Sequence, residues 1–175
     1  MPSTLDFINK PLVTAVGVPL VLGMAMGTIS RRPVQTWYRT INKPSWTPPN
    51  WAFPVAWTSL YAAMGYSSYL IYRAGLARPF LDTTTPLRLY AAQLALNIAW
   101  TPIFFGTANF GLATADILAL LGTLVATTVE FSKIDTFAAW LLVPYVAWVS
   151  YASAMTVWIW RNNPKKGRDV RRKGL

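Results

Sequence analysis

Residues 137–160 read FAAWLLVPYVAWVSYASAMTVWIW, a run with no charged side chain and many aromatic ones. A helix rises about 1.5 Å per residue, so roughly 20 apolar residues cross the hydrocarbon core of a bilayer, which is about 30 Å thick. The run is long enough to do so and has almost no polar face to turn toward water. It therefore predicts a membrane-spanning helix rather than a helix of a soluble bundle.

Four more stretches have the same length and character: residues 11–30, 51–72, 89–107 and 112–129. Every Lys and Arg lies outside the five windows, and a single acid, Asp116, lies inside one. Of the 175 residues, 54% are apolar and 13% are charged, whereas a soluble domain has roughly 25% charged residues. We expect an all-α integral membrane protein, a five-transmembrane-helix bundle over residues 1–163, followed by a basic tail at 164–175.

Composition also limits the chemistry and the partners of the protein. The chain has no Cys and no His, which excludes disulfides, thiolate nucleophiles and metal centres built on thiolate or imidazole. We expect no cofactor and no metal. The net charge of +10 does not indicate a nucleic-acid partner, because the basic residues lie between apolar runs. Asp6 and Lys10 precede the first run without a basic leader, so that run is expected to be a retained helix.

The basic residues divide unequally between the two sides of the predicted bundle. Eleven lie on the side of the C-terminus and five on the side of the N-terminus. Because cytosolic loops carry the excess of Lys and Arg, we expect a cytosolic C-terminus. The basic tail is either a topology anchor or a contact for anionic lipid, and the anchor is the simpler interpretation.

The loop before the second window is rich in Pro and Trp, since residues 43–54 read KPSWTPPNWAFP. Proline fixes φ and removes a backbone donor, so this loop is pre-ordered. Trp46, Pro48, Pro49 and Trp51 are therefore candidates for a rigid lid over a pocket. The alternative is a belt of Trp side chains at headgroup level, which needs no Pro-Pro rigidity. Four other Trp residues are expected at the membrane interface: Trp37, Trp140, Trp158 and Trp160.

Aromatic and polar side chains recur at helical spacing in three of the windows. The stripes are Trp57, Tyr61 and Met64; Gln93, Asn97 and Trp100; and Tyr145, Trp148, Ala152 and Met155. Each set occupies one face of its helix. Such faces can enclose a flat, apolar ligand with a few hydrogen-bonding groups at its edge. The alternative is ordinary helix packing, with the two amide side chains joining the helices.

Three smaller features of the windows are compatible with a structural role. Asp116 is expected near a membrane surface, paired with a basic loop residue or capping locally, because a proton relay needs further acids. Gly23 and Gly27 form a GxxxG face that serves either a neighbouring helix or a homodimer. Three prolines inside the windows free backbone carbonyls and are expected to kink their helices: Pro19, Pro102 and Pro144.

The strings KPSWTPPNWAFPVAWTSLYAAMGYSSYL, QLALNIAWTPIFFG and LLVPYVAWVSYASA resemble the translocator protein family, also called the tryptophan-rich sensory protein or peripheral benzodiazepine receptor family. Order and spacing agree over roughly residues 11 to 163. The resemblance implies a five-helix membrane bundle with a cytosolic C-terminus. It also implies a pocket toward the first loop that binds porphyrins such as protoporphyrin IX, cholesterol in animal members, and synthetic benzodiazepine ligands.

The resemblance also implies which residues bind ligand. Together with Tyr61 from the stripe of the second window, they are Trp46, Pro48, Pro49, Trp57, Asn97, Trp100, Phe105, Tyr145, Trp148 and Ala152. Two departures stand out. The cholesterol-recognition pattern at the end of the fifth window lacks its Tyr, since Val157 and Trp158 stand there. Leu112 stands where animal members often have a pocket Trp.

We expect a membrane receptor or carrier that binds porphyrin, and sterol if the altered pattern still permits it, in tetrapyrrole or lipid transport and stress signalling. The alternative is enzymatic: the resemblance implies that some members degrade protoporphyrin IX with light and oxygen, and Trp57 and Trp148 would then donate electrons. No other residue is a catalytic candidate. The resemblance points to the mitochondrial outer membrane of a eukaryote, and a homodimer remains an open alternative to a monomer.

Overall fold

The computed structural model describes residues 9–164, and within this range all regular structure is helical. The predicted tail at 164–175 lies almost entirely outside the described residues. All five predicted windows are helical, although the third ends earlier than expected. The elements are α1 (Lys10–Gln35), the short 3₁₀ turn η2 (Trp37–Arg39), α2 (Ala52–Ala77), α3 (Thr84–Thr101), the π-helical turn η3 (Pro102–Gly106), α4 (Phe110–Ser132) and α5 (Thr136–Asn162).

Side chains that precede the helices account for where four of them begin. Asn9, Asn109 and Asp135 each accept a hydrogen bond from the backbone N–H three residues later, at 3.2, 3.2 and 3.0 Å, and so satisfy donors that have no partner within the helix. Before α3, Asp82 accepts from the hydroxyl and the backbone N–H of Thr85 and from a second backbone N–H. These hydrogen bonds hold the pKa of Asp82 below its usual value, and the bond from the Thr85 side chain has the largest effect.

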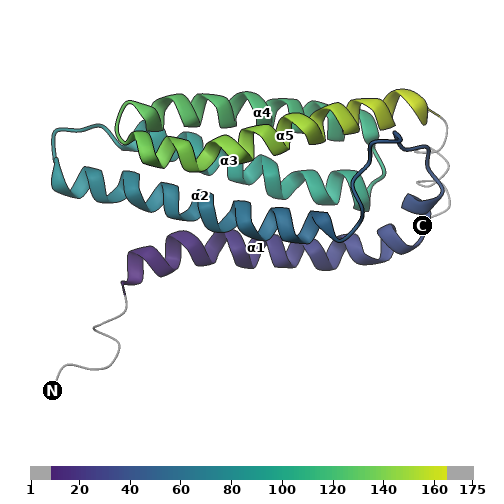
Figure 1. Ribbon diagram of the computed structural model, residues 1–175, viewed down its shortest axis with the longest axis horizontal. Coiled ribbons are helices and arrows are strands. Elements are labelled where there is room, and N and C mark those ends of the chain that lie inside the picture. Colours follow the sequence, from purple (N-terminus) through teal and green to yellow (C-terminus); the bar gives the residue numbers. More distant parts are fainter. Residues whose placement is uncertain (1–8, 165–175) are drawn as a thin grey trace, which may run out of the picture.

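The helices form a bundle whose spatial order differs from the chain order. Around the bundle the helices follow in the order α1, α2, α5, α4 and α3, and each packs on the next (Figure 1). Contacts of α1 with η3 and α3 close this ring. α2 makes few contacts with α3, the helix that follows it. The last helix therefore lies between the second and the fourth.

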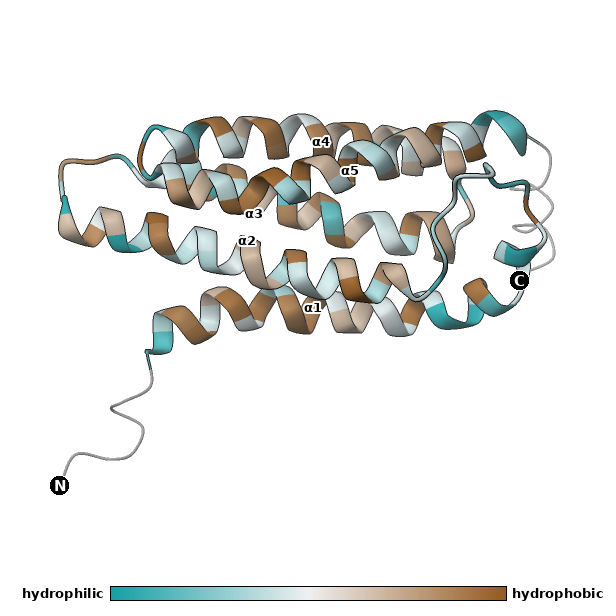
Figure 2. Cartoon of the chain, viewed as in Figure 1, coloured by the Kyte–Doolittle hydropathy of each residue, from teal (hydrophilic) through white to brown (hydrophobic). Residues whose placement is uncertain are grey.

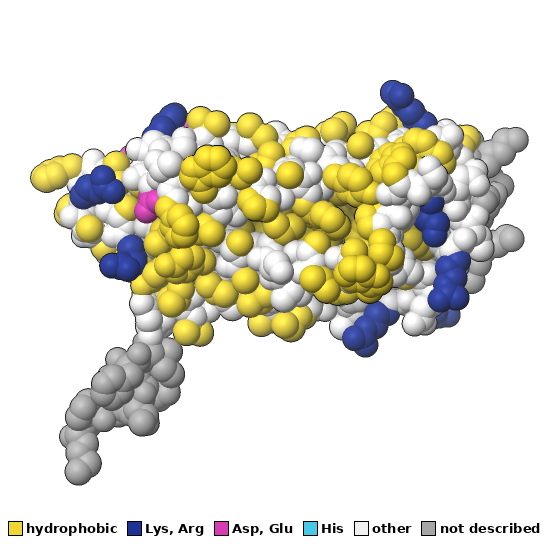
Figure 3. Space-filling view, viewed as in Figure 1, with side chains coloured by type: hydrophobic (Ala, Val, Ile, Leu, Met, Phe, Trp, Pro, Cys, Tyr) yellow, Lys and Arg dark blue, Asp and Glu magenta, His cyan; other side chains and the backbone are white. Residues whose placement is uncertain are grey.

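The outer surface of the bundle suits a bilayer. By length and composition α1, α4 and α5 are apolar enough to cross a membrane. α2 and α3 are less apolar, since they carry buried polar side chains such as Ser67, Ser68, Gln93 and Asn97. Brown, apolar residues run along the outer helices in Figure 2, and Figure 3 shows hydrophobic side chains over the middle of one face with Lys and Arg toward its two ends. This distribution is that of a membrane-spanning protein.

Glycine allows α1 to approach α2 closely. A Cβ at Gly65 would lie 2.5 Å from the Ala15 backbone oxygen, and one at Gly23 would lie 2.2 Å from the Tyr61 ring. At Gly27 a Cβ would meet nothing within 4 Å. Of the two uses predicted for the GxxxG pair, Gly23 thus serves the contact with a neighbouring helix. The two helices are in tight contact as far as Gly23 and leave space beyond it.

The prolines in the windows have different effects. α1 continues as one helix through Pro19, and α5 continues through Pro144. Pro102 instead marks the end of α3, where the chain changes to the π-helical turn η3 and Thr107 N–H donates to the Pro102 carbonyl at 3.0 Å. A proline has no N–H for the helical ladder, and wider turns of this kind absorb the interruption. The turn brings Phe104 into the core, where it is 1% exposed.

A chain of buried hydrogen bonds joins α2, α3 and α5. The Tyr61 hydroxyl donates to Asn97 Oδ1, and Asn97 Nδ2 donates to the Tyr145 hydroxyl at 2.6 Å. The Tyr145 hydroxyl donates to Gln93 Oε1 at 3.0 Å, and Gln93 Nε2 lies 3.9 Å from Met64 Sδ. Asn97 and Gln93 thus join helices as the packing alternative predicted.

Replacing Tyr145 by Phe should destabilise the bundle. The substitution keeps the ring but removes the hydroxyl that links Asn97 to Gln93, which leaves two buried amide groups short of a partner. We expect a loss of about 1–2 kcal/mol, measured as a lower Tm by circular dichroism in detergent. Tyr72→Phe is the control, because Tyr72 is 41% exposed and has no side-chain hydrogen bond among the described residues. Equal Tm values for the two variants would contradict the assignment.

Candidate functional site

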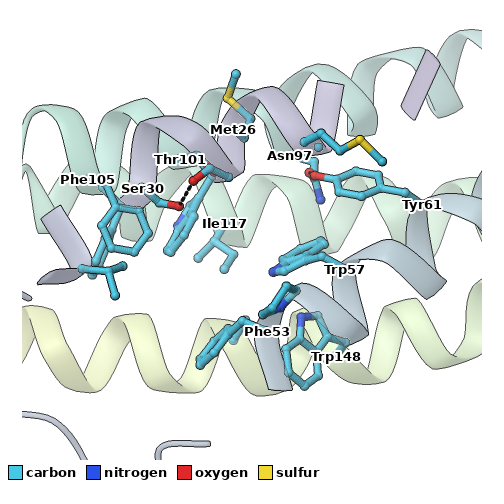
Figure 4. A pocket seen from close by; sticks show the side chains of 18 of the residues that line it. Met26, Ser30, Phe53, Trp57, Tyr61, Asn97, Thr101, Phe105, Ile117 and Trp148 are labelled. Carbon is cyan, nitrogen blue, oxygen red and sulfur yellow. Dashed lines mark hydrogen bonds between the residues drawn. The ribbon is translucent and has the colours of Figure 1, made fainter. Parts of the chain in front are cut away.

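A cavity lies inside the bundle, toward the end where α1 finishes and α2 begins. Its volume is about 700 Å³, and all five helices and both short turns contribute to its wall (Figure 4). Pockets for small organic ligands occupy roughly 300–1,000 Å³ and are mostly apolar with a few polar groups. This cavity has the size of a ligand site.

One wall of the cavity is aromatic and comes from α2 and α5. The rings of Trp57 and Trp148 are perpendicular, with centroids 6.4 Å apart. Trp57 also packs on Tyr61 at 5.6 Å, and Phe53 meets Trp148 edge-on at 5.9 Å. Figure 4 shows these four side chains directed into the same space from two ribbons. Such an arrangement presents both faces and edges of rings to a planar ligand.

Two indole groups at the cavity have donors that the protein leaves free. Trp100 Nε1 and Trp148 Nε1 are buried atoms without a hydrogen-bond partner among residues 9–164. Trp100 itself is held by stacking on Phe104, at 4.7 Å between ring centroids. Buried N–H groups nearly always have a partner in folded proteins. Both nitrogens are covered by neighbouring protein atoms, so these donors do not reach the open space of the cavity in this structure.

Seven of the predicted ligand-binding residues line the cavity: Trp57, Tyr61, Asn97, Trp100, Phe105, Trp148 and Ala152. Tyr145, fully buried, lies behind the wall and holds Asn97 by its hydroxyl. Trp46, Pro48 and Pro49 do not line the cavity. The helical stripes and the cavity wall thus largely coincide, while the loop residues lie elsewhere.

The loop between η2 and α2 is fastened to α5. Asn42 N–H donates to Asn163 Oδ1 at 2.8 Å, and Asn163 Nδ2 donates back to the Asn42 carbonyl at 2.9 Å. The Tyr151 hydroxyl donates to the Trp46 carbonyl, and the two rings meet edge-on at 5.3 Å. In Figure 1 this dark blue loop crosses the end of the bundle to reach α5. Of the loop, the cavity touches Asn50 and not the predicted lid residues.

Sequence reasoning missed the part of the wall that α1 supplies. Gly23, Met24, Gly27, Ser30 and Arg31 all line the cavity. In Figure 4 the hydroxyls of Ser30 and Thr101 point toward one another between α1 and α3. The only signal was the GxxxG spacing, which was interpreted as a packing face.

The prediction for Trp37 is wrong. Trp37 was expected at the membrane interface, but it is 3% exposed and packs against Phe104 and Phe110 at 6.1 and 5.9 Å. Trp140 and Trp160, by contrast, are exposed on the outside of the bundle. Next to Trp37, Tyr38 lines the cavity, and burial raises its pKa to about 12. Its phenol is therefore neutral at physiological pH.

Asp116 has no partner of the kind predicted. It lies in the second turn of α4, half-buried, and forms no ion pair with any residue from 9 to 164. The described residues also contain no group of three or more side chains suited to a metal ion. Apart from Arg31, the polar side chains that line the cavity are aromatic, amide or hydroxyl groups.

Known proteins resemble the chain over nearly its whole length. The profile of the TspO/MBR family matches residues 15–161. The translocator protein of Sus scrofa is 41% identical over 159 residues, which cover 87% of this chain and 92% of the relative. The translocator protein of Homo sapiens is 44% identical over 127 residues, 73% of this chain and 75% of the relative. The tryptophan-rich protein TspO of Chlorobaculum tepidum is 35% identical over 160 residues, 90% of this chain and 100% of the relative. The chain therefore belongs to the TspO/MBR family, whose aromatic stripes here enclose one cavity within the membrane bundle.

Proposed function

We propose that this protein is a membrane receptor or carrier that binds a porphyrin such as protoporphyrin IX in its five-helix cavity. It would act in tetrapyrrole or lipid transport and in stress signalling. The observation that carries the proposal is the cavity of about 700 Å³ with Trp57 and Trp148 in its wall. Perpendicular indoles contact the face and the edge of a macrocycle together.

A sterol is the second ligand that the cavity could hold, since its lining is largely apolar. At the end of α5, however, Val157 and Trp158 replace the Tyr of the recognition pattern. Sterol binding would therefore rest on the cavity itself.

Ala152→Leu should weaken porphyrin binding. Ala152 lies on the cavity wall, and the larger side chain takes space that the ligand needs. We expect roughly a tenfold rise in the Kd for protoporphyrin IX, followed by quenching of Trp fluorescence in lipid nanodiscs. Ala147→Leu is the matched control, because Ala147 is exposed on the same helix and does not line the cavity. If both variants bind like the parent protein, the ligand is not in this cavity.

A second candidate function is the light- and oxygen-dependent degradation of the porphyrin. It is favoured by the contact between Trp57 and Trp148, since an excited ligand beside either ring can take an electron from it. Tyr61 and Tyr151 stack on the two indoles at 5.6 and 6.0 Å and would help to share the resulting radical.

Illumination in air should then convert bound protoporphyrin IX to a product with a different absorption spectrum. The double variant Trp57→Phe and Trp148→Phe should abolish the conversion while retaining apolar walls. The control replaces Trp140 and Trp160, which are exposed on the outside of the bundle, by Phe. Porphyrin loss at the parent rate in the cavity variant would exclude an enzymatic role for these indoles.

We also propose that the C-terminus faces the cytosol and that the protein resides in the mitochondrial outer membrane of a eukaryote. The support is the sequence, in which eleven of the sixteen Lys and Arg residues lie in the first loop or after the fifth window. In the structure the first loop and the end of α5 lie at the same end of the bundle (Figure 1). The loop and α5 are joined there by the pair of Asn42 and Asn163.

Single cysteines test this orientation, because the natural chain has none. Ser45→Cys lies in the first loop and Phe80→Cys in the exposed loop between α2 and α3. In permeabilised cells with intact mitochondria, a maleimide on a polymer too large for outer-membrane pores should label position 45 alone. Position 80 should react only after detergent. The reverse pattern would invert the proposed topology.

A further inference from the structure

The charge on the cavity wall is positive. Of the residues that line it, Arg31 is the only charged one, and no Asp or Glu lines it. Arg31 is exposed, and no residue from 9 to 164 forms an ion pair or side-chain hydrogen bond with its guanidinium. A fork of N–H donors thus stands at the cavity without an acceptor from the described protein.

Arg31 lies on the part of the cavity wall that α1 supplies, beyond the tight contact between α1 and α2. Gly23, Gly27 and Arg31 occupy successive turns on one side of α1, and all three line the cavity. At about 1.5 Å per residue, Arg31 is about 12 Å along the helix axis from Gly23, where the Tyr61 ring closes the wall. The apolar space therefore lies between a closed end and a cationic rim.

We propose that Arg31 binds the carboxylate of the ligand and makes the cavity select an acidic amphiphile over a neutral one of the same shape. The inference rests on the proposed porphyrin binding and names the ligand class for that site. Guanidinium and carboxylate match in a planar, two-bond geometry, and such charge-assisted hydrogen bonds are stronger than neutral ones. An amphiphile whose acid group sits at one edge would bury its apolar body among the indoles and keep its charge at the rim.

A comparison with the neighbouring Arg32 distinguishes ligand binding by Arg31 from a general attraction of basic side chains to the membrane surface. Basic side chains near the end of a membrane helix commonly extend toward headgroups and anchor the helix. Arg32 is equally exposed and adjacent in sequence, but it does not line the cavity. If the charge acted only through the membrane surface, the two arginines would be equivalent.

The experiment compares protoporphyrin IX with its dimethyl ester, which has the same macrocycle and no acid group. Each is titrated against the full chain in nanodiscs of phosphatidylcholine, a lipid with no net charge, and Kd is read from Trp quenching. The variants are Arg31→Gln, Arg31→Lys and, as the matched control, Arg32→Gln. Loss of one charge-assisted contact corresponds to roughly a tenfold change in Kd.

We expect the parent protein and Arg32→Gln to bind the acid roughly tenfold more tightly than the ester. In Arg31→Gln the preference should disappear through weaker binding of the acid alone, with ester binding unchanged as evidence of an intact fold. Arg31→Lys should restore part of it, and salt should weaken acid binding only where residue 31 is basic. Equal affinity of the parent protein for both porphyrins, or an undiminished preference in Arg31→Gln, would overturn the inference and leave porphyrin binding standing. Absence of binding by either porphyrin would overturn the proposed function as well.

Discussion

A polar side chain inside a membrane bundle is costly unless it has a hydrogen-bond partner within the protein. Tyr61, Asn97, Tyr145 and Gln93 provide such partners for one another in one continuous chain across three helices. Asn97 reaches both tyrosines only if α2, α3 and α5 hold a single register. Tyr61 and Asn97 also line the cavity, so the closed end of the cavity has the geometry that the core hydrogen bonds impose. The fold and the site therefore depend on the same amide group.

Helical periodicity made the five helices and most of the aromatic wall predictable. A stripe such as Trp57 and Tyr61 faces one side of its helix whatever surrounds it, and a large ring beside a buried amide faces protein rather than lipid. Periodicity alone does not distinguish a ligand pocket from ordinary helix packing, and the structure combines the two. Tyr145 and Gln93 pack, Trp57 and Trp148 face open space, and Asn97 does both.

Two parts of the site could not be predicted, for separate physical reasons. The wall from α1 contains Gly23 and Gly27, and a small-residue stripe has the same pattern whether it faces a helix, a cavity or another copy of the chain. The docking of the first loop depends on the pair of Asn42 and Asn163, which are 121 residues apart. Local rigidity predicted that the loop is ordered but not what it lies against. Trp37 is buried for a similar reason, since its partners Phe104 and Phe110 belong to distant elements.

The spatial order of the helices has a consequence for how the protein is made. α5 follows the other four described helices in the chain, yet it stands between α2 and α4 and supplies the Tyr145 hydroxyl. Until it arrives, Asn97 and Gln93 are in the bilayer without that partner, and the first loop has no Asn163 to hold it. The cavity wall and the chain of hydrogen bonds are therefore complete only when α5 is in place. A chain interrupted before α5 would lack Tyr145 and the part of the cavity wall that Trp148 and Ala152 supply.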